Sequence, residues 1–204
     1  MLNLYYSPGA VSRASIILLE ELSADYTLTR VDFASGEQKS SEYRKVNPLG
    51  RVPGLQTPEG LLTETPAILT YLANRYPANN MALVNDIWAH AQVQSFLSLL
   101  ASTVHVNHAH GRRGDRWATE QSSFDDMRAM LPKTMSAAMQ LVEDRIAGPW
   151  VMGDHFTIVD PYLFTIAGWL EADGVDINDF PKVAAHHKTM SQRGAVISAL
   201  EKEV

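Results

Sequence analysis

Hydrophobic and polar positions repeat with two different periods in the first third of the chain. Short apolar runs at residues 2–6 and 26–33 have the composition of β-strands. Ser12, which follows the first run, is a suitable N-cap for a helix. The apolar residues after it recur at helical spacing: Ala14, Ile17, Leu18 and Leu22. This order predicts a β-α-β unit with parallel strands and a right-handed crossover.

A second group of strand and helix signals follows before residue 80. The polar segment 34–45 is predicted to be a loop or a short helix. Residues 54–57 and 61–62 flank a Pro-Glu-Gly turn, so they predict a short β-hairpin. A helix is expected from Pro66, with three apolar residues on one face: Ile68, Leu72 and Tyr76.

From about residue 83 the strand signals stop and only helical spacing remains. Two long repeats predict helices, at 93–104 and 124–142, and Pro132 is expected to kink or break the second. Thr157 and Asp160 form a capping signal at the predicted start of a third helix, and a fourth follows Pro181.

The change of pattern predicts two domains of different class. We expect an α/β domain at residues 1–77, a linker at 78–82 and an all-α domain at 83–204. The chain has 204 residues, of which 46% are hydrophobic and 20% charged, so it is globular rather than disordered and long enough to bury a core.

Charge and cysteine content narrow the classes of function. A net charge of −6 argues against a nucleic-acid partner, and the local basic patch at Arg112, Arg113 and Arg116 is diluted by Asp115. The absence of cysteine excludes disulfides, thiolate metal sites and a protein thiol nucleophile. The N-terminus does not resemble a secretory signal, and no apolar run approaches the ~18–20 residues of a membrane span. A cytoplasmic protein without a membrane partner is therefore expected.

The sequence Glu64-Thr65-Pro66 stands where a helix should begin. Proline fits the first turn, and Thr65 is expected at the N-cap. The helix end attracts a carboxylate, and Glu64 offers a charge for an ammonium group, so together they can hold an α-amino acid. The alternative from these residues alone is an ordinary capped helix with an exposed glutamate.

Val52-Pro53 precedes the predicted hairpin. A cis bond here would leave the Val52 N–H and C=O free to pair with an extended peptide, as in strand addition. A trans bond, the commoner state, leaves this possibility unsupported.

Five motifs occur in order over essentially the whole chain: YYSPGAVSRASIILLEE, NPLGRVPGL, LLTETPAILTYLA, GDHFTIVDPYLF and RGAV. Together they resemble the cytosolic glutathione transferase family, bacterial beta-like class. The resemblance implies the glutathione transferase fold, in which an α/β thioredoxin-like N-terminal domain precedes an all-α C-terminal domain, and homodimers are usual. It implies glutathione as co-substrate, a small hydrophobic electrophile as second substrate, a role in detoxification and no metal.

The resemblance also assigns residues by position. Val52 is expected to pair its backbone with the cysteinyl part of glutathione, Pro53 to be cis, and Glu64 and Thr65 to hold the γ-glutamyl end. Arg51 and Asn47 are expected beside this site. Lys39 is near, but it receives no role.

The group that activates the thiol is left open by the residues. Relatives of the beta-like class commonly have Ala-Cys-Ser where this chain has Ala-Val-Ser, with Val11 in the middle. Ser12 and His105 are the expected catalytic residues, and Tyr6 is an alternative hydroxyl donor. The run from His105 to His110 also permits a metal interpretation, but no third ligand is visible, and His108 and His110 are better explained as a solvated helix end.

The leading hypothesis is therefore a glutathione S-transferase. Two alternatives remain from the sequence: a non-catalytic glutathione-binding or regulatory protein of the same fold, and a glutathione-dependent isomerase or dehalogenase.

Overall fold

A computed structural model describes residues 1–203, without the side chain of Asn79, and the first part of it is an α/β unit. Along β1 every second residue is buried, which is the pattern of a strand with one face on a core. Strands β1 and β2 pair in parallel, with Leu4 opposite Leu28, so the predicted β-α-β unit is confirmed. Its elements are β1 (Leu2–Tyr6), α1 (Ser12–Glu21) and β2 (Tyr26–Arg30).

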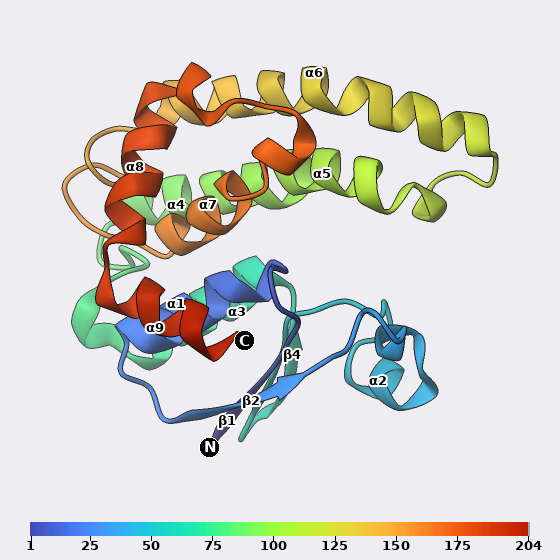
Figure 1. The fold of residues 1–204 in the computed structure, drawn as a ribbon. Coiled ribbons are helices and arrows are strands. Elements are labelled where there is room, and N and C mark those ends of the chain that lie inside the picture. Colours follow the sequence, from blue (N-terminus) through green and yellow to red (C-terminus); the bar gives the residue numbers. More distant parts are fainter. Residues whose placement is uncertain (204) are drawn as a thin grey trace.

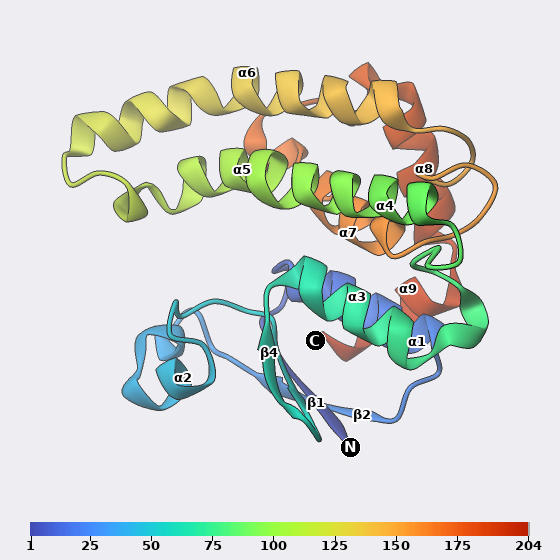
Figure 2. The same cartoon turned by 180° about the vertical axis from the view of Figure 1, so that it is seen from behind.

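The predicted hairpin completes the sheet. Strands β3 and β4 are antiparallel, and in the described part of the chain the sheet has the strand order β2-β1-β3-β4. Helices α1 and α3 lie between the sheet and the rest of the molecule, whereas α2 lies away from them (Figures 1 and 2). The elements are a 3-10 turn (Glu37–Lys39), α2 (Ser41–Val46), β3 (Gly54–Thr57), β4 (Gly60–Thr63) and α3 (Thr65–Arg75).

The second part is built of helices, as predicted. Helices α4 and α5 are joined by a π-helical turn into one rod that runs beside α6 (Figure 2), and the last helix, α9, returns to lie beside α1. The elements are α4 (Ile87–Leu99), the π turn (Leu100–Val104), α5 (His105–Arg112), α6 (Gln121–Arg145), α7 (Val159–Ala167), α8 (Pro181–Ser191) and α9 (Gly194–Lys202). Val204, the end of the predicted second domain, lies outside the described residues.

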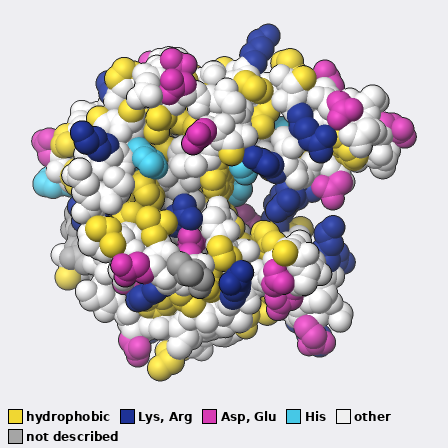
Figure 3. Space-filling model, viewed as in Figure 1, with side chains coloured by type: hydrophobic (Ala, Val, Ile, Leu, Met, Phe, Trp, Pro, Cys, Tyr) yellow, Lys and Arg dark blue, Asp and Glu magenta, His cyan; other side chains and the backbone are white. Residues whose placement is uncertain are grey.

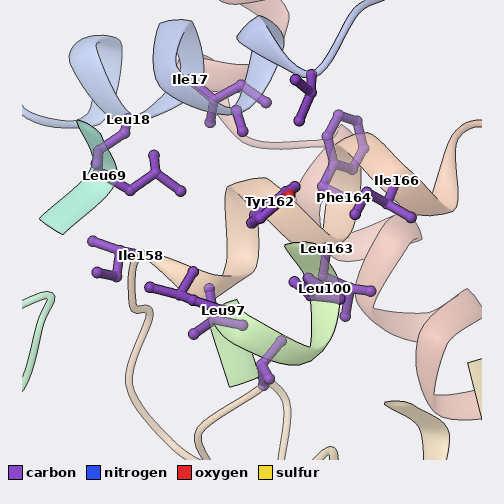
Figure 4. Close-up of a cluster of buried hydrophobic side chains, with 14 of the residues drawn as sticks. Ile17, Leu18, Leu69, Leu97, Leu100, Ile158, Tyr162, Leu163, Phe164 and Ile166 are labelled. Carbon is purple, nitrogen blue, oxygen red and sulfur yellow. The ribbon is translucent and has the colours of Figure 1, made fainter. Parts of the chain in front are cut away.

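One hydrophobic core joins the two parts. Figure 4 shows Ile17 and Leu18 of α1 and Leu69 of α3 facing side chains of α4 and α7, among them Leu97 and Leu163. All five side chains are fully buried. Burial of each such side chain contributes about 1.5–3 kcal/mol to folding. The interface between the two parts is therefore stable enough to position a site.

Two helix N-caps and the interior of one helix differ from the sequence prediction. Helix α1 has Val11, not Ser12, at its N-cap, and α3 has Glu64, not Thr65; neither cap residue makes a side-chain capping bond. Helix α6 continues through Pro132 for 25 residues, so the expected break is wrong. Proline removes one backbone donor, but the packing of a long apolar face keeps the helix intact.

The predicted capping signal before α7 is confirmed, although the helix starts two residues later than Thr157. Asp160 Oδ2 accepts hydrogen bonds from the Thr157 N–H at 2.6 Å and the Thr157 hydroxyl at 3.1 Å. Among residues 1–203, no helix combines the length and apolar character needed to cross a membrane.

Candidate functional site

A cleft of about 710 Å³ lies between the two parts of the molecule. Its walls come from the loop after β1, the segment before β3, the start of α3, and α5 with the loop that follows it. The hollow is visible on the face drawn in Figure 3. All of the predicted site residues except Ser12 line it: Asn47, Arg51, Val52, Pro53, Glu64, Thr65 and His105.

The Val52 segment presents an unused backbone edge to this cleft. The Val52–Pro53 bond is cis, as the resemblance implies. The carbonyl of the preceding residue, Arg51, accepts hydrogen bonds from the Asn47 side-chain amide and the Tyr43 hydroxyl, both at 2.8 Å. By contrast, the N–H and C=O of Val52 have no partner among the described residues. Such a pair of groups fits the backbone of an extended peptide.

Both polar atoms of the Asn47 side chain form hydrogen bonds within the segment that precedes Val52. Its Nδ2 donates to Arg51, and its Oδ1 accepts from the Leu49 N–H at 3.0 Å. The loop also needs Gly50, which has φ of +61° and sits where a Cβ would come within 2.5 Å of the Gln38 carbonyl oxygen. Arg51 is exposed and lines the cleft. Asn47 is therefore placed as a positioning residue.

The start of α3 is a second feature of the cleft. Glu64 has φ of +71°, a backbone conformation that residues other than glycine rarely adopt. Its side chain is exposed beside the helix end. The first-turn N–H groups of Thr65 and Ala67 have no acceptor within the helix. The Thr65 hydroxyl has no hydrogen-bond partner within residues 1–203. Anion-binding donors and a carboxylate therefore stand side by side, as the head of an amino acid requires.

Ser12 is not brought to the cleft. Its side chain is fully buried, and its hydroxyl lies 3.3 Å from both the carbonyl oxygen and the backbone nitrogen of Ser7. Ala10 and Val11, which precede it, line the cleft instead. The alternative donor, Tyr6, is buried with its hydroxyl directed to the Lys202 carbonyl oxygen. Ser12 is therefore placed to shape the loop after β1.

His105 follows the π turn and reaches the cleft from the helical side. Its Nδ1 lies 3.4 Å from the hydroxyl of Tyr162. Burial lowers the pKa of His105 to about 4, and positive charges nearby add to the effect: His108, Arg116 and Arg51. At neutral pH the imidazole is uncharged, so it can donate one hydrogen bond from a ring N–H.

Two cleft residues were missed from the sequence. Trp169 donates from Nε1 to the Gly9 carbonyl oxygen at 3.0 Å and stacks on His108 at 4.3 Å between ring centres. Tyr162 is buried, and burial together with Glu64 raises its pKa.

His108, expected at a solvated helix end, is instead held by the buried carboxylate of Asp173 at 2.8 Å. No group of three or more potential metal ligands occurs within residues 1–203.

Comparison with known proteins identifies the family. Residues 2–74 match the family described as "Glutathione S-transferase, N-terminal domain", and residues 125–189 match "Glutathione S-transferase, C-terminal domain". Glutathione S-transferase GstA of Escherichia coli O157:H7 is 34% identical over 205 residues, which is 99% of this chain and 98% of that protein.

Solved structures agree with this result. A glutathione transferase homolog from Sulfitobacter with bound glutathione has a TM-score of 0.96 and 45% identity, covering 99% of this chain and 98% of that one. A sphingomonad glutathione S-transferase complexed with glutathione has a TM-score of 0.85 and 32% identity, with 98% of both chains covered. The chain belongs to the glutathione S-transferase family, and its fold is a thioredoxin-like domain followed by an all-helical domain.

Proposed function

We propose that this chain is a glutathione S-transferase that binds glutathione in the cleft and joins its sulfur to a small hydrophobic electrophile. The observation that carries the proposal is the meeting of two features in one cleft: the unpaired backbone edge of Val52 and the amino-acid-binding start of α3 at Glu64. A single tripeptide with an α-amino acid head and an extended backbone satisfies both.

The proposed placement follows from the partners that each group needs. The γ-glutamyl ammonium pairs with the Glu64 carboxylate, and the α-carboxylate accepts from the α3 first turn and Thr65. The cysteinyl N–H and C=O pair with Val52, next to Pro53. The glycyl carboxylate then extends toward the segment that contains Asn47 and Arg51.

The thiolate lies, in this proposal, between the start of α1 and His105. A free thiol has a pKa of about 8.5, so a site that favours the anion must supply donors or positive potential. The N-terminal end of α1, at Val11, supplies the helix dipole, and neutral His105 supplies an N–H. Ser12 acts through the loop that it holds.

Retention on immobilised glutathione, followed by conjugation assays with aromatic electrophiles, tests the function. We expect retention, elution by free glutathione and turnover. Retention without turnover over a broad panel would favour the non-catalytic binding protein. Absence of any heat in calorimetry with glutathione would refute the proposal.

Several finer properties belong to the same proposal: membership of the beta-like class, a cytoplasmic location, a role in detoxification and the domain boundaries at 77 and 83. A homodimer is supported by large apolar side chains exposed at the start of α4, where Ile87 is 89% and Trp88 72% accessible. Light scattering should give twice the chain mass, and Trp88→Glu should lower it.

A further inference from the structure

The cleft carries a charge opposite to that of the chain. The sequence has 17 Lys and Arg against 23 Asp and Glu. The cleft, however, is lined by two acidic residues, Glu64 and Asp115, and by a cationic set: Lys39, Arg44, Arg51, Arg112, Arg113 and Arg116. Figure 3 shows Lys and Arg side chains gathered on both sides of the hollow. The positive field is therefore concentrated where the ligands bind.

Three of these cations form a wall on the helical side: Arg112, Arg113 and Arg116. Within residues 1–203, none of the three forms an ion pair with a carboxylate. Arg112 donates from Nη2 to the Ala172 carbonyl oxygen at 3.1 Å, and the Arg113 guanidinium lies 5.8 Å from the centre of the Phe33 ring. The arginine wall is held in place but not neutralised.

The cations also lie close enough to repel one another. Partial burial lowers the pKa of Arg116, and the neighbouring Arg51 and Arg113 lower it further. Asp115 offsets part of this repulsion, but one carboxylate beside several cations leaves a net positive charge in the empty cleft, and a bound anion relieves it. An arginine fork is also well matched to a planar carboxylate.

Glutathione does not account for this wall in the placement proposed above. Its ammonium and α-carboxylate are satisfied by Glu64 and the start of α3. Its glycyl carboxylate extends along the N-terminal part, where Arg51, Lys39 and Arg44 are available. The arginine wall, which the helical part contributes, remains for the second substrate.

We propose that the second substrate is an anionic electrophile, with an aromatic or apolar body and a carboxylate that binds the arginine wall. This inference rests on the proposed function. Trp117, exposed in the same cleft, and Trp169 provide flat apolar surfaces for the body. For an aryl halide of this class, the thiolate sulfur forms a bond to the ring carbon. The halide leaves with the electron pair of the bond that breaks, and the carboxylate is unchanged.

A matched pair of electrophiles tests the charge. 4-Chloro-3-nitrobenzoate and its methyl ester react at the same carbon and differ in charge. Each kcat/KM is divided by the rate constant of the uncatalysed reaction with glutathione, which removes the difference in intrinsic reactivity. We expect the wild-type protein to prefer the carboxylate by about tenfold, the worth of one charge-assisted hydrogen bond.

Neutral substitutions locate the effect. Arg112→Gln, Arg113→Gln and Arg116→Gln together should remove the preference for the carboxylate, with the ester changed by less than about twofold. Arg128→Gln is the matched control, because Arg128 is exposed on α6, outside the cleft, and forms a surface pair with Asp125 at 3.3 Å. It should leave the preference unchanged. Circular dichroism checks that each variant is folded.

A binding measurement decides the inference even where neither electrophile reacts. Calorimetry on the glutathione-loaded protein should detect 3-nitrobenzoate more tightly than nitrobenzene, and the triple variant should lose the difference. If the normalised kcat/KM values of acid and ester were equal, and the two nitro compounds bound equally, the inference of an anionic substrate would be wrong. The proposed glutathione transfer would be unaffected by that result. Failure of the wild-type protein to bind glutathione would instead refute the proposed function.

Discussion

The indole Nε1 of Trp169 donates a hydrogen bond to the carbonyl oxygen of Gly9, 160 residues earlier, at 3.0 Å. The bond joins the helical part to the loop after β1, and both residues line the cleft. Trp169 is itself supported by stacking on His108, which is held by the Asp173 carboxylate. The position of the loop at the start of α1 therefore depends on a residue beyond the end of α7.

Trp169→Phe should loosen this loop while keeping the aromatic packing. We expect a loss of about 1 kcal/mol in unfolding free energy, the usual contribution of one hydrogen bond, and a rise of a few-fold in KM for glutathione. Urea denaturation and steady-state conjugation measure the two effects. Tyr71→Phe is the control, because it removes a surface hydrogen bond to Glu59 at 2.8 Å outside the cleft, and it should leave KM unchanged. An unchanged KM in Trp169→Phe would show that the loop position does not depend on this bond.

Glu64→Gln should weaken glutathione binding much more than it slows the chemical step. The change keeps the size of the side chain and removes the charge that pairs with the ligand ammonium, so Kd should rise on the order of tenfold. Calorimetry gives Kd, and kcat at saturating glutathione should change little. Glu59→Gln is the control, because Glu59 lies on the hairpin turn and contacts Arg75 at 3.5 Å. An equal Kd for Glu64→Gln and the wild type would contradict the assignment of the ammonium site.

Ser12→Ala separates a catalytic hydroxyl from a positioning one. The structure has the hydroxyl 3.3 Å from the Ser7 backbone, so the variant should lose stability and activity together while the pKa of bound glutathione stays the same. The ultraviolet absorbance of the thiolate, followed against pH in the binary complex, reports that pKa directly. A clear upward shift in this pKa would restore Ser12 as a direct hydrogen-bond donor to sulfur.

Local signals predicted much of this fold because they depend on neighbouring residues. The hairpin, the parallel β1–β2 pair and the Thr157–Asp160 cap are each specified within a few positions. Pro132 does not break α6, which was one of the two expected outcomes, because tertiary packing outweighs the loss of one backbone bond in a helix of 25 residues. The π turn at residues 100–104, which directly precedes His105, has no comparable local signature.

The candidate site was predictable only where its residues are close in sequence. Val52 and Glu64 each carry a recognisable motif. The contacts of Trp169 and His108 are made by partners 160 and 65 residues away, so no periodicity reveals them. The sequence showed the basic patch at Arg112 to Arg116. Only the fold shows that this patch lies near Arg51 and His105.

Acid should destabilise the protein through His105. Its pKa falls from 6.5 in a model compound to about 4 in the fold, so between these values the unfolded chain binds a proton that the folded one does not. Stability from this group is therefore complete above pH 6.5 and is lost as the pH falls toward 4. The loss is on the order of 3 kcal/mol. His105→Gln should flatten this part of the stability profile in urea denaturation, and an identical slope in both proteins would contradict the neutral, half-buried imidazole.

Asp160→Ala should be the most destabilising of these changes, for reasons unrelated to the cleft. Asp160 is fully buried and accepts hydrogen bonds from the Val151 N–H at 2.9 Å, the Thr157 N–H and hydroxyl, and His186 Nε2 at 3.0 Å. Removal of one carboxylate leaves several buried donors without an acceptor, at a cost of about 3–5 kcal/mol.

The matched control for this change is Asp154→Ala, because Asp154 is exposed a few residues earlier in the same segment. Its midpoint of urea denaturation should match that of the wild type. The folded fraction of Asp160→Ala at low temperature should still bind glutathione with wild-type Kd, since Asp160 does not line the cleft. A normal denaturation midpoint for Asp160→Ala would mean that water replaces the carboxylate, and the cap would then be dispensable for the start of α7.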